Sequence, residues 1–156
     1  MPWRRRFEPL IRPLFRIASR LTRGLTLGVR GLVLNERGEV LLIQHTYVKG
    51  WYMPGGGVER GETAEAALVR ELVEEAGVRA TSRPVLLSLH SNHIRFPGDH
   101  VLIYRVDGWE ACQATSRGEI LAVGWFAPDA LPTDITASTR TRIEEALGGI
   151  SPHPHW

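Results

Sequence analysis

The sequence lacks most features of secreted, membrane-spanning and repetitive proteins. It has a single cysteine, Cys112, which excludes a disulfide within the chain, so we expect a reducing compartment, by default the cytoplasm. Its longest apolar blocks, residues 40–43 and 120–123, have the length of strands, whereas a transmembrane helix needs roughly 18 consecutive apolar residues. Internal repeats and low-complexity segments are also missing. These absences exclude a disulfide-built domain, a helical membrane protein and a repeat protein.

What the sequence does contain is the composition of one ordinary globular domain. Its 156 residues are 43% apolar and 23% charged. One domain typically takes about 150 residues, and a chain of this size can bury a sizeable core without disulfides. We divide it into an N-terminal arm at residues 1–23, a body at residues 24–150 and a proline-broken tail at residues 151–156.

The arm differs from the rest of the chain in charge. Residues 1–23 hold seven arginines and one acid, a balance of +6, whereas the remainder holds 12 basic and 16 acidic residues, a balance of −4. Apolar residues lie between the arginines, so the arm is partly amphipathic, although Pro9 and Pro13 confine any helix to its second half. We expect it to pack on the body or on a partner protein. An anionic membrane surface and nucleic acid are the alternatives.

Alternating apolar residues predict several strands, and helical signals occur in two places. We expect strands at residues 25–33, 40–44, 85–90, 101–106 and 121–126. A helix begins after the N-cap Thr63 and ends at Gly77. A last helix spans residues 139–147, with a capping box of Thr141 and Glu144. Strands and two helices in one unit indicate a mixed α/β layered domain.

The first helix has an apolar side and an acidic side. On a wheel of about 100° per residue, the side predicted to face the core consists of Ala66, Val69, Leu72, Val73 and Ala76. Glu71, Glu74 and Glu75 share another side, where they repel each other and oppose the helix dipole. Arg70 points about 100° away from Glu71 on this wheel, so we expect a divalent cation with oxygen ligands to compensate the cluster.

The loop before this helix suits phosphate chemistry. Gly55, Gly56 and Gly57 allow the backbone to approach a ligand closely, and their carbonyls can bind metal. Magnesium held by a few carboxylates, with substrate phosphates completing its coordination, is a common arrangement. Solvated glutamates on an exposed helix are the alternative. The adjacent glycine loop favours a metal-dependent phosphoryl or pyrophosphoryl site.

One segment, GGVERGETAEAALVRELVEEAGV at residues 56–78, resembles the Nudix box. In that box a glycine is followed after five residues by a glutamate, and after seven more by R-E-apolar-x-E-E-x-G-apolar. Every fixed position is filled at the right spacing, by Gly56, Glu62, Arg70, Glu71, Leu72, Glu74, Glu75, Gly77 and Val78. The resemblance implies an α/β/α sandwich around a mixed β-sheet. It also implies Mg²⁺- or Mn²⁺-dependent hydrolysis of a nucleoside diphosphate linked to another moiety.

The resemblance also assigns roles by position. It gives metal binding to Glu71, Glu74, Glu75 and the Gly55 carbonyl, orientation of the glutamates to Arg70, and bracing of the loop to Glu62. Glu71 and Glu75 are the main ligands, and Glu74 is a further ligand or the catalytic base. Family members often take another carboxylate from a late loop, for which Glu119 is the candidate and an exposed turn acid the alternative.

Contacts to substrate are expected from the glycine loop and the residues before it. Gly56 and Gly57 are candidates through their backbone, and Trp51 and Tyr52 through stacking on a nucleobase.

The histidines are weaker candidates. His90, His93 and His100 surround an expected hairpin and could touch substrate, although partly exposed structural roles are the alternative. His153 and His155 have a metal-binding spacing, but their place in the tail favours disorder.

Two functional hypotheses from different classes remain at this point. The first is a Nudix pyrophosphohydrolase acting on a small nucleotide, with ADP-ribose-like compounds and nucleoside triphosphates ahead of dinucleoside polyphosphates. The second is a binding or regulatory module of the same fold whose arm contacts a membrane, nucleic acid or protein. The intact glutamate set favours the enzyme. A homodimer is a candidate assembly, and no sequence-specific binding of nucleic acid is expected.

Overall fold

The structure is a computed structural model that describes residues 24–116 and 118–156, so the predictions for the arm at residues 1–23 lie outside the described residues. Its elements are β1 (Thr26–Val33), β2 (Val40–His45), β3 (Trp51–Tyr52), α2 (Ala64–Glu71), the π-helix η1 (Leu72–Ala76), β4 (Val78–Ala80), β5 (Val85–Ser91), β6 (Asp99–Val106), β7 (Trp109–Ala111), β8 (Ile120–Phe126) and α3 (Ala137–Gly148). The described helices are all too short or too polar to cross a membrane.

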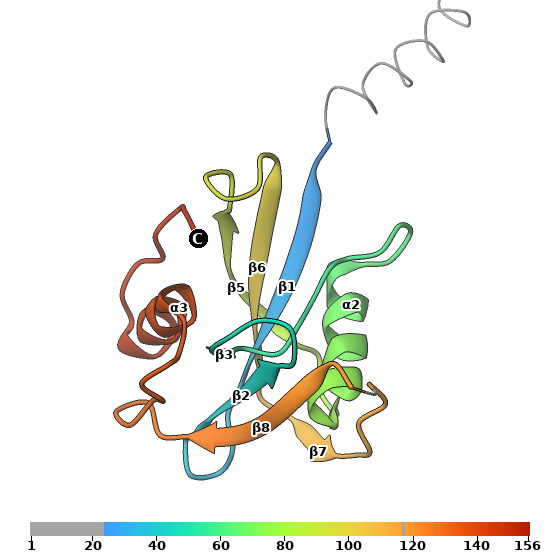
Figure 1. Cartoon of the computed structure of the whole chain (residues 1–156), viewed down its shortest axis with the longest axis vertical. Coiled ribbons are helices and arrows are strands. Elements are labelled where there is room, and N and C mark those ends of the chain that lie inside the picture. The colour runs from blue at the N-terminus through green and yellow to red at the C-terminus, as the bar shows by residue number, and fades with distance from the viewer. Residues whose placement is uncertain (1–23, 117) are drawn as a thin grey trace, which may run out of the picture.

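The strands form three small sheets between two helices (Figure 1). In the first, of order β1-β6-β5, β1 is parallel to β6 and β5 is antiparallel to it, so the sheet is mixed, as predicted. β2 pairs with β3 and β8 in the second sheet, and β4 with β7 in the third, all antiparallel. α2 and α3 lie on opposite sides of the strands. The predicted α/β class and layer order are confirmed.

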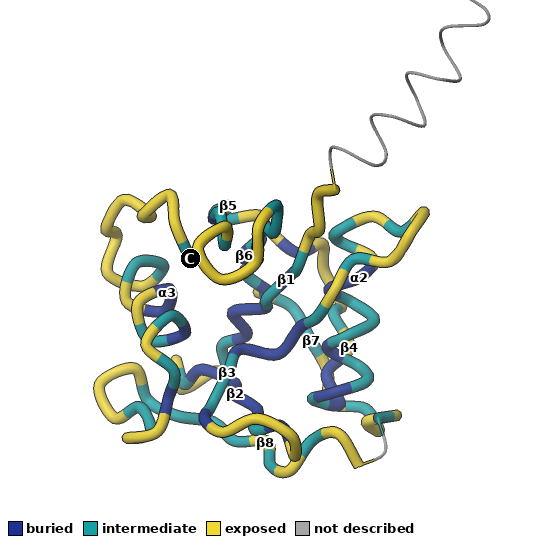
Figure 2. Tube along the Cα trace, turned by 45° about the horizontal axis from the view of Figure 1, so that its top comes forward, coloured by how far each residue is buried: buried dark blue, intermediate teal, exposed yellow. Residues whose placement is uncertain are grey.

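β1 separates two hydrophobic cores, because successive side chains of a strand point to opposite faces. Val29 packs with Leu68 and Leu72 of the helix that follows the glycine loop. Leu32 packs with Ile143 of α3. All five side chains are at most 1% exposed, and Figure 2 shows the buried positions concentrated along the central strands and the inner sides of the helices.

The predicted ends of the first helix are confirmed. Thr63 is the N-cap, and its Oγ1 accepts a hydrogen bond from Ala66 N at 3.1 Å. Gly77 ends the helical segment in the left-handed region, with φ of 62°. A residue with a side chain is strained in that conformation, so glycine is required there.

The predicted capping box of the last helix is wrong. α3 begins at Ala137, and its N-cap is Thr136, whose Oγ1 accepts from Thr139 N at 3.4 Å. Several threonines follow one another here, and any of them can cap a helix. The sequence alone does not distinguish Thr136 from Thr141 as the N-cap. In the structure the backbone is extended at Thr136 and helical from Ala137 onward.

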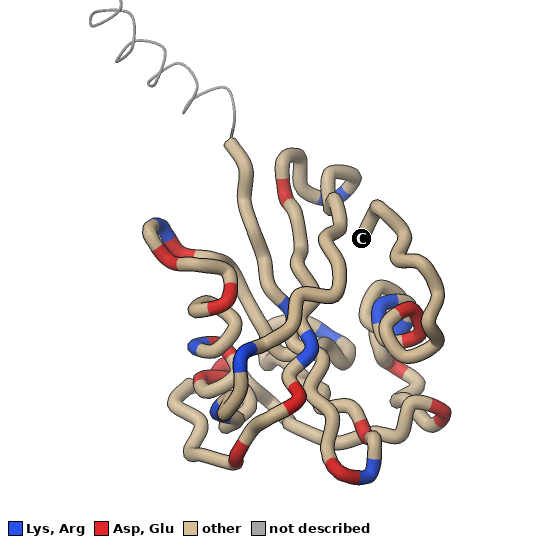
Figure 3. The backbone as a smooth tube through the Cα atoms, turned by 180° about the vertical axis from the view of Figure 1, so that it is seen from behind, with Lys and Arg blue, Asp and Glu red and all other residues tan. Residues whose placement is uncertain are grey.

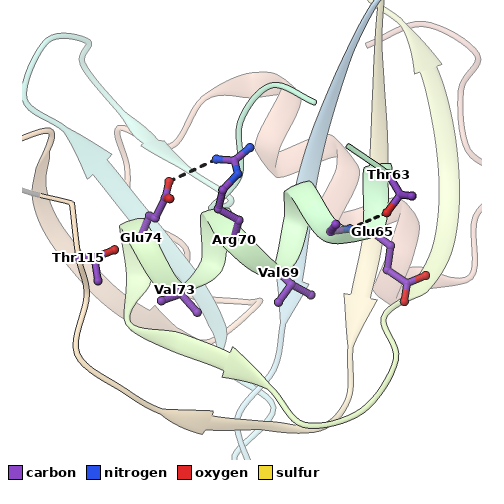
Figure 4. Close-up of a pocket in the computed structure, with 8 residues that line it drawn as sticks. Thr63, Glu65, Val69, Arg70, Val73, Glu74 and Thr115 are labelled. Carbon is purple, nitrogen blue, oxygen red and sulfur yellow. Dashed lines mark hydrogen bonds and ion pairs between the residues drawn. The ribbon is translucent and has the colours of Figure 1, made fainter. Parts of the chain in front are cut away.

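The predicted core side of the first helix is confirmed for Leu72 and Ala76, which pack in the core, but wrong for Ala66, Val69 and Val73. Leu68 and Leu72 are buried against β1, where a Cβ at Gly31 would lie 3.2 Å and 3.1 Å from their methyl groups. Val69 and Val73 are half-buried and line an open pocket of about 620 Å³ on the outer side of the helix (Figure 4). The segment is apolar on both sides. The side with Leu68 and Leu72 packs on β1 because Gly31 has no side chain and lets the helix approach the strand closely.

The tail is ordered against the body, so the expectation of disorder for residues 151–156 is wrong. Ser91 N donates to Pro154 O at 2.8 Å, and Trp156 N donates to Ser91 O at 2.9 Å. His153 N donates to Glu145 Oε1 at 3.0 Å. Ser91 lies on β5, far from the tail in sequence, and Glu145 lies on α3, eight residues before His153. Local sequence patterns do not report either contact.

Candidate active site

The glycine loop is fixed against β1 by backbone hydrogen bonds. Val29 N donates to Gly56 O at 2.9 Å, and Val58 N donates to Leu27 O at 2.8 Å. A Cβ added at Gly56 would collide with the carboxylate of Glu71, and one at Gly55 would collide with the Val29 carbonyl. The loop therefore lies directly over the acidic helix because it carries no side chains there.

Arg70 reaches the carboxylate of Glu71, although the helical wheel placed the two residues about 100° apart, and it also contacts Glu74 and Glu62. Its Nη1 donates to Glu71 Oε1 at 2.8 Å and to Glu74 Oε2 at 3.3 Å, the latter contact shown in Figure 4. Nε and Nη2 bond both oxygens of Glu62, at 3.0 Å and 3.1 Å, and Nη2 donates to Gly57 O at 3.2 Å. A long side chain with a forked head can span positions that a wheel separates. Arg70 thus compensates part of the acidic cluster.

These contacts change the proton affinities of the partners. Hydrogen bonding to Glu62 raises the pKa of Arg70. The same bond, together with one from Glu59 N at 3.1 Å, lowers the pKa of Glu62. Glu62 therefore ties the loop to the helix as a carboxylate, which is the geometry expected of a bracing residue. Figure 3 shows acidic positions on the loop and helix interleaved with basic ones.

Glu75 has the most unusual environment of the three clustered glutamates. It is only 8% exposed, and its Oε2 accepts from Gly55 N at 2.7 Å. Its Oε1 lies 3.9 Å from His45 Nδ1. Burial, which disfavours the charged form, raises the pKa of Glu75 to about 7. A cation placed nearby would favour its ionised form.

Two residues of this site, Arg30 and His45, were missed by the sequence analysis. Arg30 Nη1 donates to Met53 O at 3.2 Å and also to Gly55 O. Burial lowers the pKa of Arg30, and the charge of Glu75 opposes that shift. Burial also lowers the pKa of His45, so the imidazole is favoured in its neutral form. The one available signal was an arginine inside an otherwise apolar strand.

The oxygen ligands expected for a divalent cation are gathered here, but they do not all face one point. Among the described residues, no three His, Cys, Asp or Glu side chains are placed to hold a metal ion together. Glu71 and Glu74 are turned onto Arg70, and Glu75 onto Gly55 N. The donor chemistry fits a hard divalent cation, because every candidate ligand is an oxygen. To bind it, Glu71 and Glu74 would have to rotate away from Arg70, and Arg30 away from the Gly55 carbonyl.

Glu119, the candidate carboxylate from a late loop, is close enough to the site for its charge to act on it. It precedes β8, is exposed, and its carbonyl oxygen accepts from Thr46 N at 2.9 Å. Its charge contributes to the raised pKa values of Glu75 and Tyr47. The carboxylate thus acts on the site from a loop far from the helix in sequence.

The two aromatic candidates are directed to different places. Trp51 packs edge-on against Phe126, with ring centroids 4.7 Å apart, and adds to the core beneath α3. The ring of Tyr52 lies 5.6 Å from that of His45 and lines a cavity of about 750 Å³ beside α3. We call this space the α3 cavity. Tyr52 therefore lies between this cavity and His45, whose Nδ1 is 3.9 Å from Glu75 Oε1.

The histidines divide between structural and exposed positions. His90 is fully buried, with Nε2 2.7 Å from Ser88 Oγ and Nδ1 2.6 Å from His153 O, as in the structural alternative. His93 is exposed, and His100 Nδ1 lies 3.3 Å from Gly98 O.

Comparison with known proteins gives matches over most of the body. A family model described as NUDIX domain matches residues 24–146. A MutT-like protein of Streptomyces ambofaciens is 32% identical over 128 residues, which cover 82% of this chain and 80% of that protein. The 8-oxo-dGDP phosphatase NUDT18 of Mus musculus is 38% identical over 140 residues, covering 83% of this chain but only 40% of that protein.

A solved structure shows the same arrangement of elements. The crystal structure of a MutT NUDIX hydrolase from Burkholderia pseudomallei matches with a TM-score of 0.66 and 28% identity. The match covers 78% of this chain and 97% of the other.

Proposed function

Because the chain belongs to the Nudix hydrolase family, we propose that it uses a divalent cation, Mg²⁺ or Mn²⁺, to hydrolyse the pyrophosphate bond of a small nucleotide. The observation that supports this most strongly is the acidic helix under the glycine loop. Glu71, Glu74 and Glu75 meet there with Arg70, and Gly56 has no side chain that would displace the Glu71 carboxylate.

In this proposal the cluster divides the work between binding and positioning. Glu71 and Glu75 would hold the cation with the Gly55 carbonyl, and Glu74, whose side chain is 42% exposed, would be a further ligand or accept the proton of the attacking water. Arg70 would hold the free carboxylates in place. When bound, the cation supplies Lewis-acid polarisation of the phosphoryl oxygens and neutralises their developing charge.

Glu119 would complete the site from the opposite side. Helix carboxylates reach a bound pyrophosphate from one direction only, and a ligand or base on the β8 side encloses it. The influence of the Glu119 charge on Glu75 supports this placement.

The substrate class is proposed from the relatives and from the α3 cavity. The mouse relative is named for action on 8-oxo-dGDP, and a volume of about 750 Å³ falls in the usual range for small-molecule sites. We propose nucleoside di- and triphosphates, normal or oxidised, and ADP-ribose-like compounds as the substrates to test.

A substrate panel with identification of the products tests this function. Purified protein is incubated with these nucleotides and Mg²⁺ or Mn²⁺, and the products are separated by chromatography. We expect release of a nucleoside monophosphate from at least one of them, and no release in excess chelator. Turnover that persists in chelator would contradict metal dependence. Saturable nucleotide binding without any turnover would favour the binding-module hypothesis.

A further inference from the structure

Residues 152–156, which we call the strap, are fixed along the free edge of the first sheet. β5 is an edge strand, and Ser91 at its end bonds Pro154 O and Trp156 N. This makes a parallel bridge between Ser91 and His155. The strap therefore extends the sheet by a short strand fragment.

The strap is anchored on a buried ion pair of α3. Arg142 is 4% exposed, and its Nη2 lies 2.9 Å from Glu145 Oε1. Nη1 donates to the carbonyl oxygens of His155 and His153, at 3.0 Å and 3.4 Å. The Trp156 ring lies over the same guanidinium, 6.0 Å from Cζ. A buried cation needs acceptors, and the strap supplies two carbonyl oxygens to Arg142 in addition to Glu145 Oε1 and His90 Nδ1.

The strap is also a wall of the α3 cavity. His153, His155 and Trp156 line it, and so does Tyr52, whose ring lies 5.6 Å from that of His45. The remaining walls come from the end of β5 and the β5–β6 loop and from the N-terminal part of α3 with its N-cap: Ser91, Asn92, Ile94, Arg95, Thr136, Ala137, Ser138, Thr141 and Arg142. Among the described residues that line this space there is no Asp or Glu. A ligand there meets hydrogen-bond donors and aromatic surface but no carboxylate that would repel it.

We propose that the strap determines substrate specificity, by forming the wall against which the nucleoside part of the substrate packs. The inference rests on the proposed function, because it places the reacting pyrophosphate at the glutamates. The imidazoles of His153 and His155 and the ring of Trp156 offer stacking and donor groups to a nucleobase. Bases with acceptor-rich edges, such as guanine, suit this lining best.

Two variants and one matched control test the proposal by kinetics. H153A/H155A removes the lining imidazoles, and with them the bond from His155 N to His153 Nδ1 at 3.1 Å, but keeps the bonds of Pro154 and Trp156 to Ser91. Deletion of residues 152–156 removes the wall. Ile150→Ala, an exposed position outside the lining, is the control. We expect both variants to raise KM for nucleotides about tenfold, to keep kcat within about threefold, and to alter the preference between guanine and adenine nucleotides. The control should match the wild type.

A binding measurement separates this proposal from the proposed function. Guanosine and adenosine monophosphate are titrated into metal-free wild-type protein, and the imidazole proton resonances of His153 and His155 are followed by NMR, with the guanine nucleotide expected to shift them more. Shifts without any turnover in the substrate panel would support the strap and contradict the hydrolase.

Clear outcomes overturn the strap proposal. The first is a wild-type protein that turns over nucleotides together with a folded H153A/H155A variant whose KM and base preference are unchanged. The second is that the resonances of His153 and His155 do not shift when either nucleotide is added. If the deletion variant does not fold, the double substitution decides alone.

Discussion

At the scale of single residues, the site depends on how each glutamate is partnered. Glu71 and Glu74 are turned to Arg70, whereas Glu75 is buried beside Gly55 N and the neutral His45. The first pair is held by the Arg70 guanidinium and must rotate away from it to reach a cation. Glu75 is held in an environment that favours its neutral form until a cation arrives.

Replacing Glu75 by glutamine should reduce catalysis but stabilise the metal-free protein at high pH. The folded pKa of about 7 exceeds the ordinary value of 4.5, so the folded state binds more protons between these values. The free energy of unfolding therefore falls as pH rises through this window. In chelator, we expect Glu75→Gln to melt about 5 °C above wild type at pH 8 and close to it at pH 4.

The exposed Glu144→Gln serves as the control for this experiment and should follow the wild-type pH dependence. At saturating Mg²⁺, the kcat of Glu75→Gln should fall at least about a hundredfold. Near-native turnover would remove Glu75 from the proposed metal site.

Glu119→Gln should lower kcat much more than it raises KM, because a metal or base contact counts most in the transition state. Stability should change by no more than about 0.5 kcal/mol, since the residue is exposed. Steady-state kinetics and thermal melts on the same preparation measure both effects. If the variant has the same kcat and KM as the wild type, Glu119 has no catalytic role and is only an exposed acid in a turn.

At the scale of elements, the acidic helix is placed by its neighbours. It passes from α2 into the π-helix η1, which has i→i+5 bonding, before Gly77 ends it. A helical wheel drawn for a uniform α-helix therefore places the residues of η1 at the wrong angles. Glu75, which the wheel put on the acidic side, is buried in the structure. Gly31 beneath the helix and Gly56 above it set the distances to β1 and to the loop.

A pair of glycine substitutions tests the close approach of loop and helix. An alanine Cβ at Gly56 would collide with Glu71, whereas nothing lies within 4 Å of a Cβ at Gly57, and neither glycine has a positive φ. We expect Gly56→Ala to weaken Mg²⁺ affinity about 10- to 100-fold and Gly57→Ala to leave it unchanged. Titration of activity against metal concentration measures this. Equal effects of both substitutions would contradict the steric argument.

At the scale of the whole molecule, β1 partitions the body into two halves with separate cores. The half beneath α2 carries the acidic cluster, and the half beneath α3 carries the α3 cavity and the strap. Between the halves, Tyr52 of β3 lines the α3 cavity and its ring lies 5.6 Å from that of His45, whose Nδ1 is 3.9 Å from Glu75 Oε1.

Deleting residues 1–20 should leave the metal-dependent kcat within about threefold, because residues 24–146 contain the whole family match and every proposed catalytic group. We expect oligomeric state, solubility or binding to anionic vesicles to change instead, since the arm has a balance of +6. Light scattering and vesicle sedimentation measure these. A folded truncation that binds metal but has lost turnover would place the arm in the active site.

The sequence by itself determined the chemistry of the site and the limits of the acidic helix. The spacing of Gly56, Arg70 and the glutamates, the N-cap Thr63 and the left-handed Gly77 all act within one loop and helix, where local sequence is sufficient. The strand pattern likewise predicted the α/β class.

Tertiary structure alone decided which side of the helix is buried, which residues surround Glu75, and where the tail lies. Gly31, Arg30 and His45 belong to strands far from the box, and their contact with it arises only when the sheets pack on the helix. The strap is ordered for the same reason, because Arg142 and Ser91 become its partners only in the folded chain. Burial and long-range pairing are properties of the packed molecule, and no local spacing specifies them.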